Sequence, residues 1–228
     1  MKAVSFTVKG TIAHFRRPDT TATQLTYPFI TPTAAKGLVG AILGITDFVT
    51  HDKVAIALLH PVRTTAQQLS MLGKDNGRTF NRPTTIELLV NPAYRIYYVG
   101  DEHVDELAKR LLHREAVYPT YLGSGYALTF PLFGAFYESV QPLPQQVDQV
   151  QTRTVIPVHF VKQLIFAENE YLSRANGFMQ NYLGQRNFEK SLSFLYERTG
   201  CEITFIPDDA VWEAKGVVRA GDEYLCLT

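Results

Sequence analysis

The stretch from His14 to Gly44 holds the side chains best suited to bind a phosphate group. Arg16 and Arg17 form a basic pair after an alternating strand pattern, and Tyr27 offers an aromatic face in the Thr-rich loop that follows. The helix expected next begins with free backbone N–H groups and the positive end of the helix dipole, which both attract anions. These features predict a phosphate or RNA site, with ordinary solvated surface charge as the alternative for the two arginines.

A helix is predicted over residues 32–43, because both of its ends can be read from the sequence. Thr31 suits the N-cap, Pro32 the first helical position and Gly44 the residue beyond the end. Apolar residues at helical spacing predict one buried face. The opposite face carries Thr33, Lys36, Gly37 and Gly40. A glycine inside a helix costs about 1 kcal/mol against alanine, so the two glycines predict close approach by a backbone, either of this chain or of a nucleic acid.

Residues 63–85 form an excursion between two predicted strands. Asn76-Gly77 in the middle of this segment is a strong hairpin-turn signal. The segment contains one acidic residue, Asp75, against the basic residues Arg63, Lys74, Arg78 and Arg82. We therefore predict a projecting basic hairpin, and a merely flexible surface loop is the alternative.

Gly123-Ser124-Gly125 is a short glycine turn that could let backbone N–H groups approach a phosphate. It lacks the lysine and the spacing of a P-loop, so we do not interpret it as one. The six histidines are scattered along the chain, and only His14 lies beside the basic pair. A lone histidine is weak evidence for a general base, so we expect His14 to be solvated or satisfied by hydrogen bonds.

The composition describes an ordinary globular protein with a local rather than a global basic surface. The 228 residues include 22 Lys and Arg against 22 Asp and Glu, so the net charge is zero. A neutral chain argues against a free-standing nucleic-acid binder held by bulk electrostatics. Cys201 and Cys226 are too few and too isolated for a metal site or a disulfide framework, and we expect no cofactor.

We expect a cytoplasmic protein that does not interact with a membrane. Free cysteines favour a reducing compartment. The first ten residues have a strand pattern rather than that of a signal peptide. No apolar run approaches the roughly 20 residues that a membrane-spanning helix needs.

The periodicity of apolar residues predicts an α+β fold. Strands are expected at about residues 4–8, 54–59, 86–90 and 94–99, and a second helix after Asp101 as its cap. A last strand follows the glycine turn and ends at about Tyr137. The order strand, helix, strand, strand, helix, strand is the ferredoxin-like βαββαβ arrangement, which RNA-recognition modules share.

Three segments are predicted from the change in composition along the chain. Residues 1–140 form the ferredoxin-like domain with its insertion at about 63–85, and residues 141–154 are a Pro/Gln-rich linker. Residues 155–228 form a small β-rich extension with strands expected at 155–166, 201–206 and 224–227. Within it, the polar stretch 168–197 is weakly helical near 188–197.

The signature FRRPDTTATQLTYPFITPTAAKGLVGAILG resembles the N-terminal motif of the Cas5 family of CRISPR-associated RAMP proteins. Family members typically show an aromatic–Arg–x–Pro step, a Thr-Tyr-Pro-Phe turn and a Pro-capped helix. The matching residues are Phe15, Arg16 and Pro18, then Thr26 to Phe29, then Pro32 to Gly44. Residues 81–99 look like the family's strands after its thumb-like insertion, and residues 121–127 look like its glycine loop. The resemblance covers roughly the first 140 residues and is greatest to the type I-B branch.

This resemblance implies a non-catalytic subunit at the base of the Cascade surveillance complex. Such a subunit holds the 5′ handle of the guide RNA (crRNA), contacts the large subunit and packs against the first backbone subunit. The thumb-like insertion helps to display the guide in segments, and contact with target DNA near the protospacer-adjacent motif is left open. The RNA-binding residues expected are Arg16, Arg17, Tyr27, Thr33, Lys36, Gly37, Arg63, Arg78, Arg82, Gly123, Ser124 and Gly125.

One branch of the family, type I-C, cuts the precursor RNA with a Tyr/Lys/His set that includes an adjacent Lys-His pair. This chain has no Lys-His dipeptide. A metal-independent endoribonuclease acting on CRISPR repeat RNA is still kept as the alternative to RNA binding without catalysis. A scaffold that contacts only proteins is a weaker third hypothesis.

Overall fold

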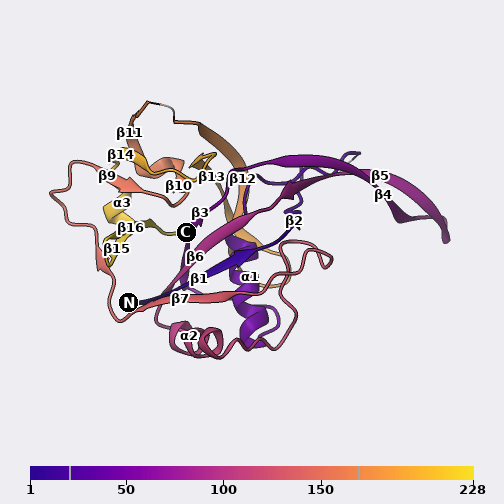
Figure 1. Ribbon diagram of the computed structural model, residues 1–228, viewed down its shortest axis with the longest axis horizontal. Coiled ribbons are helices and arrows are strands. Elements are labelled where there is room, and N and C mark those ends of the chain that lie inside the picture. Colours follow the sequence, from indigo (N-terminus) through magenta and orange to yellow (C-terminus); the bar gives the residue numbers. More distant parts are fainter. Residues whose placement is uncertain (21, 169) are drawn as a thin grey trace.

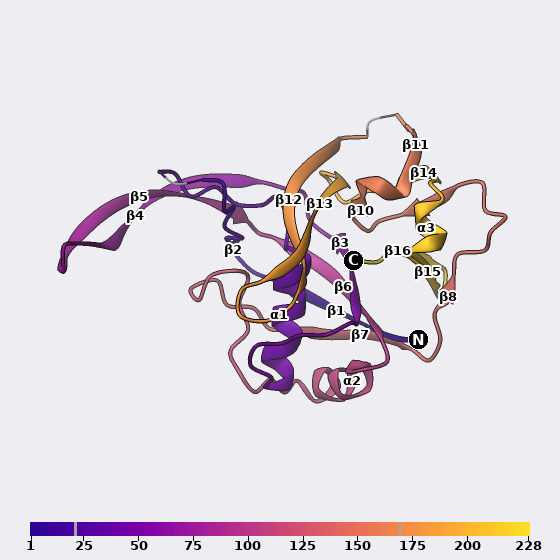
Figure 2. The same ribbon diagram turned by 180° about the vertical axis from the view of Figure 1, so that it is seen from behind.

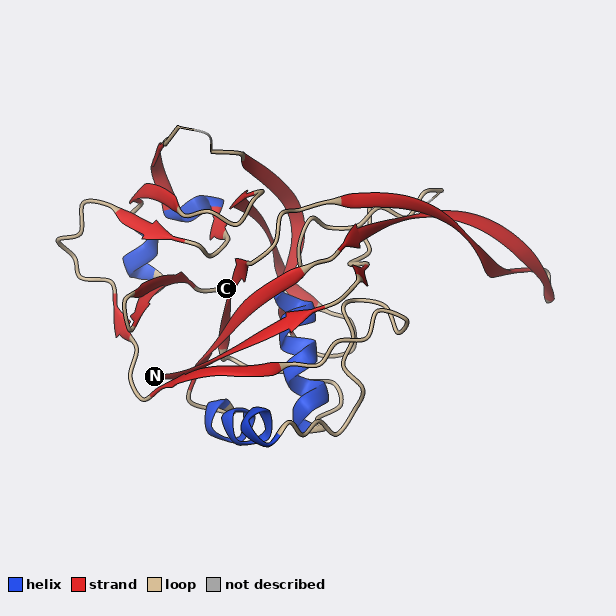
Figure 3. Cartoon of the chain, in the orientation of Figure 1, coloured by secondary structure: helices blue, strands red, loops and turns tan. Residues whose placement is uncertain are grey.

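A computed structural model describes residues 1–20, 22–168 and 170–228, and its centre is an antiparallel sheet of four strands. The strand order is β3-β6-β1-β7. These strands are β1 (Lys2–Lys9), β3 (Lys53–Leu58), β6 (Ala93–Gly100) and β7 (Leu132–Tyr137). Helix α1 (Pro32–Leu43) lies between β1 and β3 in the chain, and α2 (Val104–His113) lies between β6 and β7 (Figure 1). The predicted α+β class is confirmed, with few helices among many strands (Figure 3).

Helix α1 has the boundaries and caps that the sequence predicts. The Thr31 hydroxyl accepts a hydrogen bond from the Ala34 N–H at 3.1 Å, and Pro32 is the first helical residue. Gly44 ends the helix with a φ of 79°, a conformation that glycine adopts without strain. The apolar stripe of the helix packs into the main core against the central sheet. No helix among the described residues is both long and apolar enough to span a bilayer.

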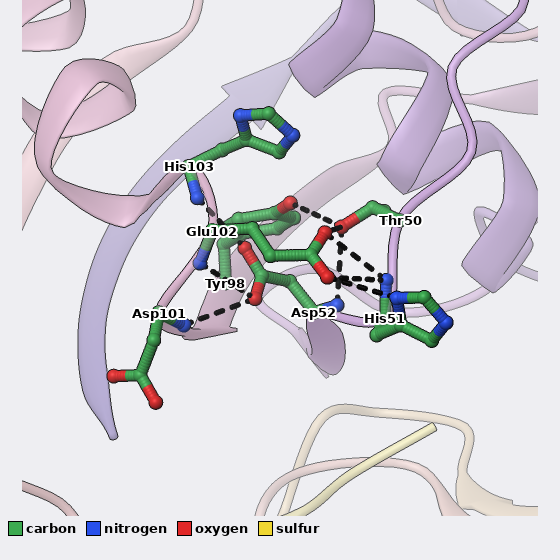
Figure 4. A network of polar contacts seen from close by, with 7 residues as sticks. All are labelled: Thr50, His51, Asp52, Tyr98, Asp101, Glu102 and His103. Carbon is green, nitrogen blue, oxygen red and sulfur yellow. Dashed lines mark hydrogen bonds and ion pairs between the residues drawn. The ribbon is translucent and has the colours of Figure 1, made fainter.

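The prediction of Asp101 as the cap of α2 is wrong, because the N-cap residue is His103 and a distant loop holds the turn before the helix. The helix starts at Val104, and no side chain caps its N-terminus from within the helix. The carboxylate of buried Asp52 instead accepts hydrogen bonds from the N–H groups of Asp101, Glu102 and His103, at 3.0, 3.2 and 3.0 Å (Figure 4). Asp52 therefore fixes the turn that leads into α2, and no side chain caps the first turn of the helix among the described residues.

The second face of the central sheet is covered by the end of the chain. Small side chains of the sheet, Ala3, Ala55 and Ala57, pack with Tyr97 against β15 (Val217–Ala220) and β16 (Glu223–Cys226). RNA-recognition modules stack bases on the open face of such a sheet. Here that face is core, so any contact with RNA has to use other surfaces.

The predicted basic hairpin is confirmed and is longer than the sequence indicates. Strands β4 (Thr64–Asp75) and β5 (Arg78–Val90) pair along their whole length and project away from the body of the fold (Figure 1). Asn76 and Gly77 form the tip with φ values of 45° and 79°, as a two-residue hairpin turn of this type requires. The strand expected at 86–90 is the end of β5. The two-residue strand β2 (Ile12–Ala13) pairs with this end.

The prediction of weak helix near residues 188–197 is wrong. Strands β12 (Leu172–Tyr182) and β13 (Phe188–Glu197) form a long antiparallel hairpin, which runs beside α1 (Figure 2). Their buried aromatic residues follow the two-residue period of a strand, which brings Phe178, Phe194 and Tyr196 into the main core beside Phe29. The core of the predicted first domain thus includes side chains from the predicted extension.

Residues 141–154 are not an open linker. They contain the short strands β8 (Gln141–Pro142) and β9 (Val150–Thr152), and Leu143 and Val150 are buried. These apolar side chains pack in a core cluster with strands of the C-terminal part. The remaining elements are β10 (Ile156–Pro157), the 3-10 helix η1 (Val158–Phe160), β11 (Val161–Ile165), β14 (Ile203–Pro207) and α3 (Ala210–Glu213).

Candidate nucleic-acid interface

The two glycines of α1 have different surroundings. A Cβ added to Gly40 would lie 2.8 Å from the Cβ of Phe48, so the chain's own packing requires glycine there. A Cβ added to Gly37 would meet nothing within 4 Å among the described residues. No internal contact therefore compensates the helix-propensity cost of Gly37, about 1 kcal/mol against alanine. Of the two predicted close-approach positions, Gly37 is the one open to a partner.

Lys36 lies beside Gly37 and has no partner among the residues that the structure describes. Its side chain is half-buried and makes neither a hydrogen bond nor an ion pair with them. Burial lowers the pKa of Lys36 to about 8, with a smaller upward effect from Asp52. A half-buried ammonium without a partner is unfavourable, and an anion bound at this place would offset the loss of hydration.

Two adjoining cavities lie between α1 and the β12–β13 hairpin. The first, the apolar cavity, has a volume of about 250 Å³. Its larger apolar walls are Pro32, Phe48, Tyr182 and Phe188, and Thr33 and Gly37 also line it. The second, the lysine cavity, has a volume of about 410 Å³. Its charged or titratable walls include Lys36, Lys53, Lys190, His51, His159 and Glu189. Five residues line both cavities, so the cavities adjoin, and we call the two together the depression; these residues are Lys36, Thr50, Gln180, Asn181 and Tyr182.

Arg16 and Arg17, the predicted basic pair, have different surroundings in the structure. Arg17 forms a two-pronged ion pair with Asp19, with Nε–Oδ1 at 3.1 Å and Nη2–Oδ2 at 2.6 Å. This pairing lowers the pKa of the Asp19 carboxyl, so the charge of Arg17 is already matched locally. Arg16 is exposed and forms no ion pair with a described residue. Arg16 lines neither of the two cavities, so the structure does not bring it into the same depression as Lys36.

The expectation of an accessible stacking face at Tyr27 is contradicted. Tyr27 is only 6% exposed, and its ring centroid lies 4.3 Å from that of Phe178 on β12. Its hydroxyl donates a hydrogen bond to the carbonyl of Gly177. The ring is sealed by the hairpin that the sequence did not reveal. In this structure Tyr27 fastens the hairpin to the loop before α1 and offers no face to a base.

The projecting hairpin carries two of the predicted cations on one face. The register of β4 and β5 places Arg78 and Arg82 on the same side, with Phe80 between them. Phe80 is 47% exposed, and its ring lies over Gly73, where an added Cβ would be 2.6 Å from the ring. Arg63 lies at the base of the hairpin and lines a separate cavity of about 660 Å³. The three arginines therefore belong to two different places.

The glycine turn is shaped by internal packing. Gly123 has a φ of 82°, and an added Cβ would lie 2.1 Å from the carbonyl oxygen of His14. Ser124 accepts a backbone hydrogen bond from Ala127 at 2.8 Å, and Gly125 is exposed. The close approach of Gly123 is thus to this chain's own backbone, while Gly125 remains accessible.

His14 is buried rather than positioned as a base. Its Nδ1 lies 2.8 Å from the Glu87 carbonyl oxygen, and burial lowers the pKa of the imidazole. Its Nε2 has no partner among the described residues. The expectation of a satisfied histidine therefore holds for one ring nitrogen only. Within the same residues no group of three metal-ligating side chains is present.

Sequence reasoning missed the residues that complete the depression. Phe48, Gln180, Phe188 and Lys190 surround Lys36 although three of them lie more than 140 positions away in the chain. A sequence signal that could have indicated the hairpin is the two-residue period of Leu192, Phe194 and Tyr196 in β13, which the apolar Leu195 obscures.

Comparison with known proteins places this geometry in a family. The family described as CRISPR-associated protein (Cas_Cas5) matches residues 3–133, which is more than half of the chain. None of the curated proteins compared with the chain matches it.

Solved structures show the same overall fold at low identity. A chain of a CRISPR RNA-guided surveillance complex has a TM-score of 0.55 at 12% identity, covering 89% of this chain and 91% of that one. A CRISPR protein from Archaeoglobus fulgidus has a TM-score of 0.55 at 11% identity, covering 99% and 98%. A chain of a type III-B Cmr-beta complex bound to cognate target RNA and AMPPnP also has a TM-score of 0.55, at 8% identity, covering 100% and 98%. With a family match over more than half its length, the chain belongs to the Cas5 family of CRISPR-associated proteins.

Proposed function

We propose that this protein is a non-catalytic subunit of a type I CRISPR surveillance complex of the Cascade kind, in which it binds and caps the 5′ handle of the guide RNA. The observation that carries the proposal is the accessible face of α1, where bare Gly37 lies beside the ammonium of Lys36, which has no partner among the described residues. This combination suits a phosphate backbone, which needs both a cation and room to approach.

The architecture supports this role. The strand order β3-β6-β1-β7, with α1 connecting β1 to β3 and α2 connecting β6 to β7, is the one expected of a ferredoxin-like βαββαβ domain. Since the C-terminal strands cover one face of the sheet, we assign the RNA to the accessible face of α1 and to the projecting hairpin. The structural likeness to a chain of an RNA-guided surveillance complex is consistent with such an assembly.

The neutral charge of the chain indicates that neighbours complete the RNA groove. We assign the large subunit and the first backbone subunit of the complex as those neighbours. The Arg78 and Arg82 face of the hairpin would contact the guide where the backbone subunits begin. Assignment to type I-B, and contact with target DNA near the protospacer-adjacent motif, are further predictions.

The test is the RNA content of the purified complex. Reversing two charges, Arg16→Glu with Lys36→Glu, should lower the RNA bound per complex while the isolated subunit keeps its far-UV circular dichroism. Arg219→Glu is a matched control, because Arg219 is an exposed arginine on β15 that hydrogen-bonds near its own turn. Unchanged RNA content in the double variant would contradict the assigned surface.

A further inference from the structure

We propose that the apolar cavity and the lysine cavity together hold one nucleotide of the bound RNA, with the base in the first and the phosphate in the second. This inference rests on the proposed function, because it assumes that RNA reaches the start of α1. It adds a single-nucleotide pocket to that surface, with its own residues and its own preference for ribose.

The apolar cavity has the size and walls that a base requires. Phe48 comes from the loop after α1, and Tyr182 and Phe188 come from the two sides of the β12–β13 turn. The rings of Tyr182 and Phe188 lie 5.4 Å apart at 50°, so they form an aromatic wall rather than a closed stack. Gly37 leaves the facing side free of a side chain. Bases of any sequence stack on such aromatic faces.

The lysine cavity holds more positive charge than its own carboxylates offset. Lys36 has no partner among the described residues, and the charge of Lys190 helps to lower the pKa values of both Lys53 and His159, for which burial is the larger cause. Lys53 donates a hydrogen bond to the Ala214 carbonyl at 2.9 Å. Cations that crowd one another in a cavity are stabilised by a bound anion.

The carboxylates around this cavity are already engaged. Glu189 accepts a hydrogen bond from the side-chain amide of Asn181. The Oε1 atom of Glu102 lies 2.9 Å from the Nδ1 atom of His51. Asp52 accepts hydrogen bonds with both of its oxygens from the turn before α2. None of the three forms an ion pair with Lys36, Lys53 or Lys190 among the described residues. Asp52 and Glu102 act on Lys36 only through their charges at a distance, and a phosphate in this cavity would supply the direct ion pair that these lysines do not make with described residues.

Gln180 lies at the junction of the two cavities, where the sugar of such a nucleotide would be. Its side chain lines both cavities and is only 9% exposed. Its Oε1 is buried and has no hydrogen-bond partner among the described residues. Buried polar atoms without partners are uncommon and call for an explanation. A ribose 2′-hydroxyl reached by a small turn of this side chain would supply the missing donor, and a deoxyribose would not.

Photocrosslinking of the reconstituted complex tests this inference. The guide RNA carries 4-thiouridine at one position of its 5′ segment at a time, and the crosslinked peptides are identified by mass spectrometry. We expect one position to crosslink to peptides that contain Phe48, Tyr182 or Phe188. Phe188→Ala should lower that crosslink about tenfold, since a stacking contact is worth roughly that factor.

Two further arms separate the pocket from general effects. Phe130→Ala is the control, because Phe130 is 78% exposed and lines neither cavity. A 2′-deoxy sugar at the crosslinking position should lower competitive loading of the guide by roughly three- to tenfold in the unaltered complex and have no effect in Gln180→Leu.

The outcomes distinguish this inference from the proposed function. A complex that contains no RNA would refute the proposed function and this inference with it. A complex that retains RNA, but whose 5′ segment crosslinks only outside the two cavities, would overturn the pocket alone. If the 2′-deoxy sugar lowers guide loading by the same factor in Gln180→Leu as in the unaltered complex, the proposed role of Gln180 is overturned.

Discussion

Lys36→Met should stabilise the isolated protein while it weakens RNA binding. The fall in the pKa of Lys36 from 10.5 to about 8 means that folding disfavours its charged form. One pKa unit corresponds to about 1.4 kcal/mol, so the charged lysine costs up to about 3 kcal/mol at pH 7. Methionine has a similar length and no charge. We expect the variant to gain about 1 to 3 kcal/mol in the free energy of unfolding at pH 7.

The pH dependence of this gain follows from the direction of the shift. The folded state loses the Lys36 proton near pH 8, whereas the unfolded chain keeps it until near 10.5. Between these values the unfolded state binds more protons, so the stability of the unaltered protein rises with pH relative to the variant. The advantage of Lys36→Met is therefore complete below about pH 8 and disappears as the pH approaches 10.5.

Urea unfolding at several pH values between 7 and 10, followed by circular dichroism, measures this difference. Lys109→Met is the matched control, because Lys109 is an exposed residue of α2 and its replacement should change stability little. RNA content of complexes built with each variant gives the second readout. The reasoning is refuted if Lys36→Met destabilises the protein at pH 7, or if its effect on stability does not change with pH.

Three other predictions follow from the same structure. Gly37→Ala should stabilise the isolated chain by up to about 1 kcal/mol and reduce RNA loading. Gly40→Ala should destabilise the chain, because the added Cβ would clash with Phe48. Urea unfolding of both variants checks this difference, and equal effects on stability would contradict it. Asp52→Ala should destabilise the protein by about 1 to 3 kcal/mol, because three N–H groups of the turn before α2 lose their acceptor. Thermal unfolding checks this, and an unchanged melting temperature would oppose it. Incubation of the protein with CRISPR repeat RNA in EDTA should give no defined cut, and a specific product would instead support the endoribonuclease alternative.

The sequence predicted the parts of the fold whose signals are local. Thr31, Pro32 and Gly44 mark both ends of α1, and Asn76-Gly77 marks the tip of the projecting hairpin. Each of these residues acts through its own backbone conformation or through neighbours a few positions away. Their effects could therefore be read without knowledge of the tertiary structure.

Features that depend on distant contacts were not predictable in this way. The turn before α2 is held by Asp52, which lies about fifty positions earlier in the chain, and local reasoning assigned Asp101 as a cap instead. Tyr27 reads as an exposed loop aromatic until Phe178 and Gly177 cover it. The polar composition of β12 and β13 hid a hairpin whose strand pairing stabilises it.

The candidate site shows the same division. Thr33, Lys36 and Gly37 could be proposed together because a helix places them on one face. The partners across the cavity, Gln180 and Phe188, belong to the hairpin that was missed. The sequence thus indicated one wall of the depression, and only the tertiary structure supplied the other.

Protection of the guide's 5′ end tests the central claim most directly. The complex is assembled with and without this subunit and treated with a 5′-to-3′ exoribonuclease that acts on a 5′-monophosphate end, after enzymatic phosphorylation of the RNA where its 5′ end requires it. The account predicts that the complete complex shields the 5′ handle, and that omission of the subunit exposes the handle while the rest of the guide stays protected. A 5′ handle that is equally protected without this subunit would contradict the account.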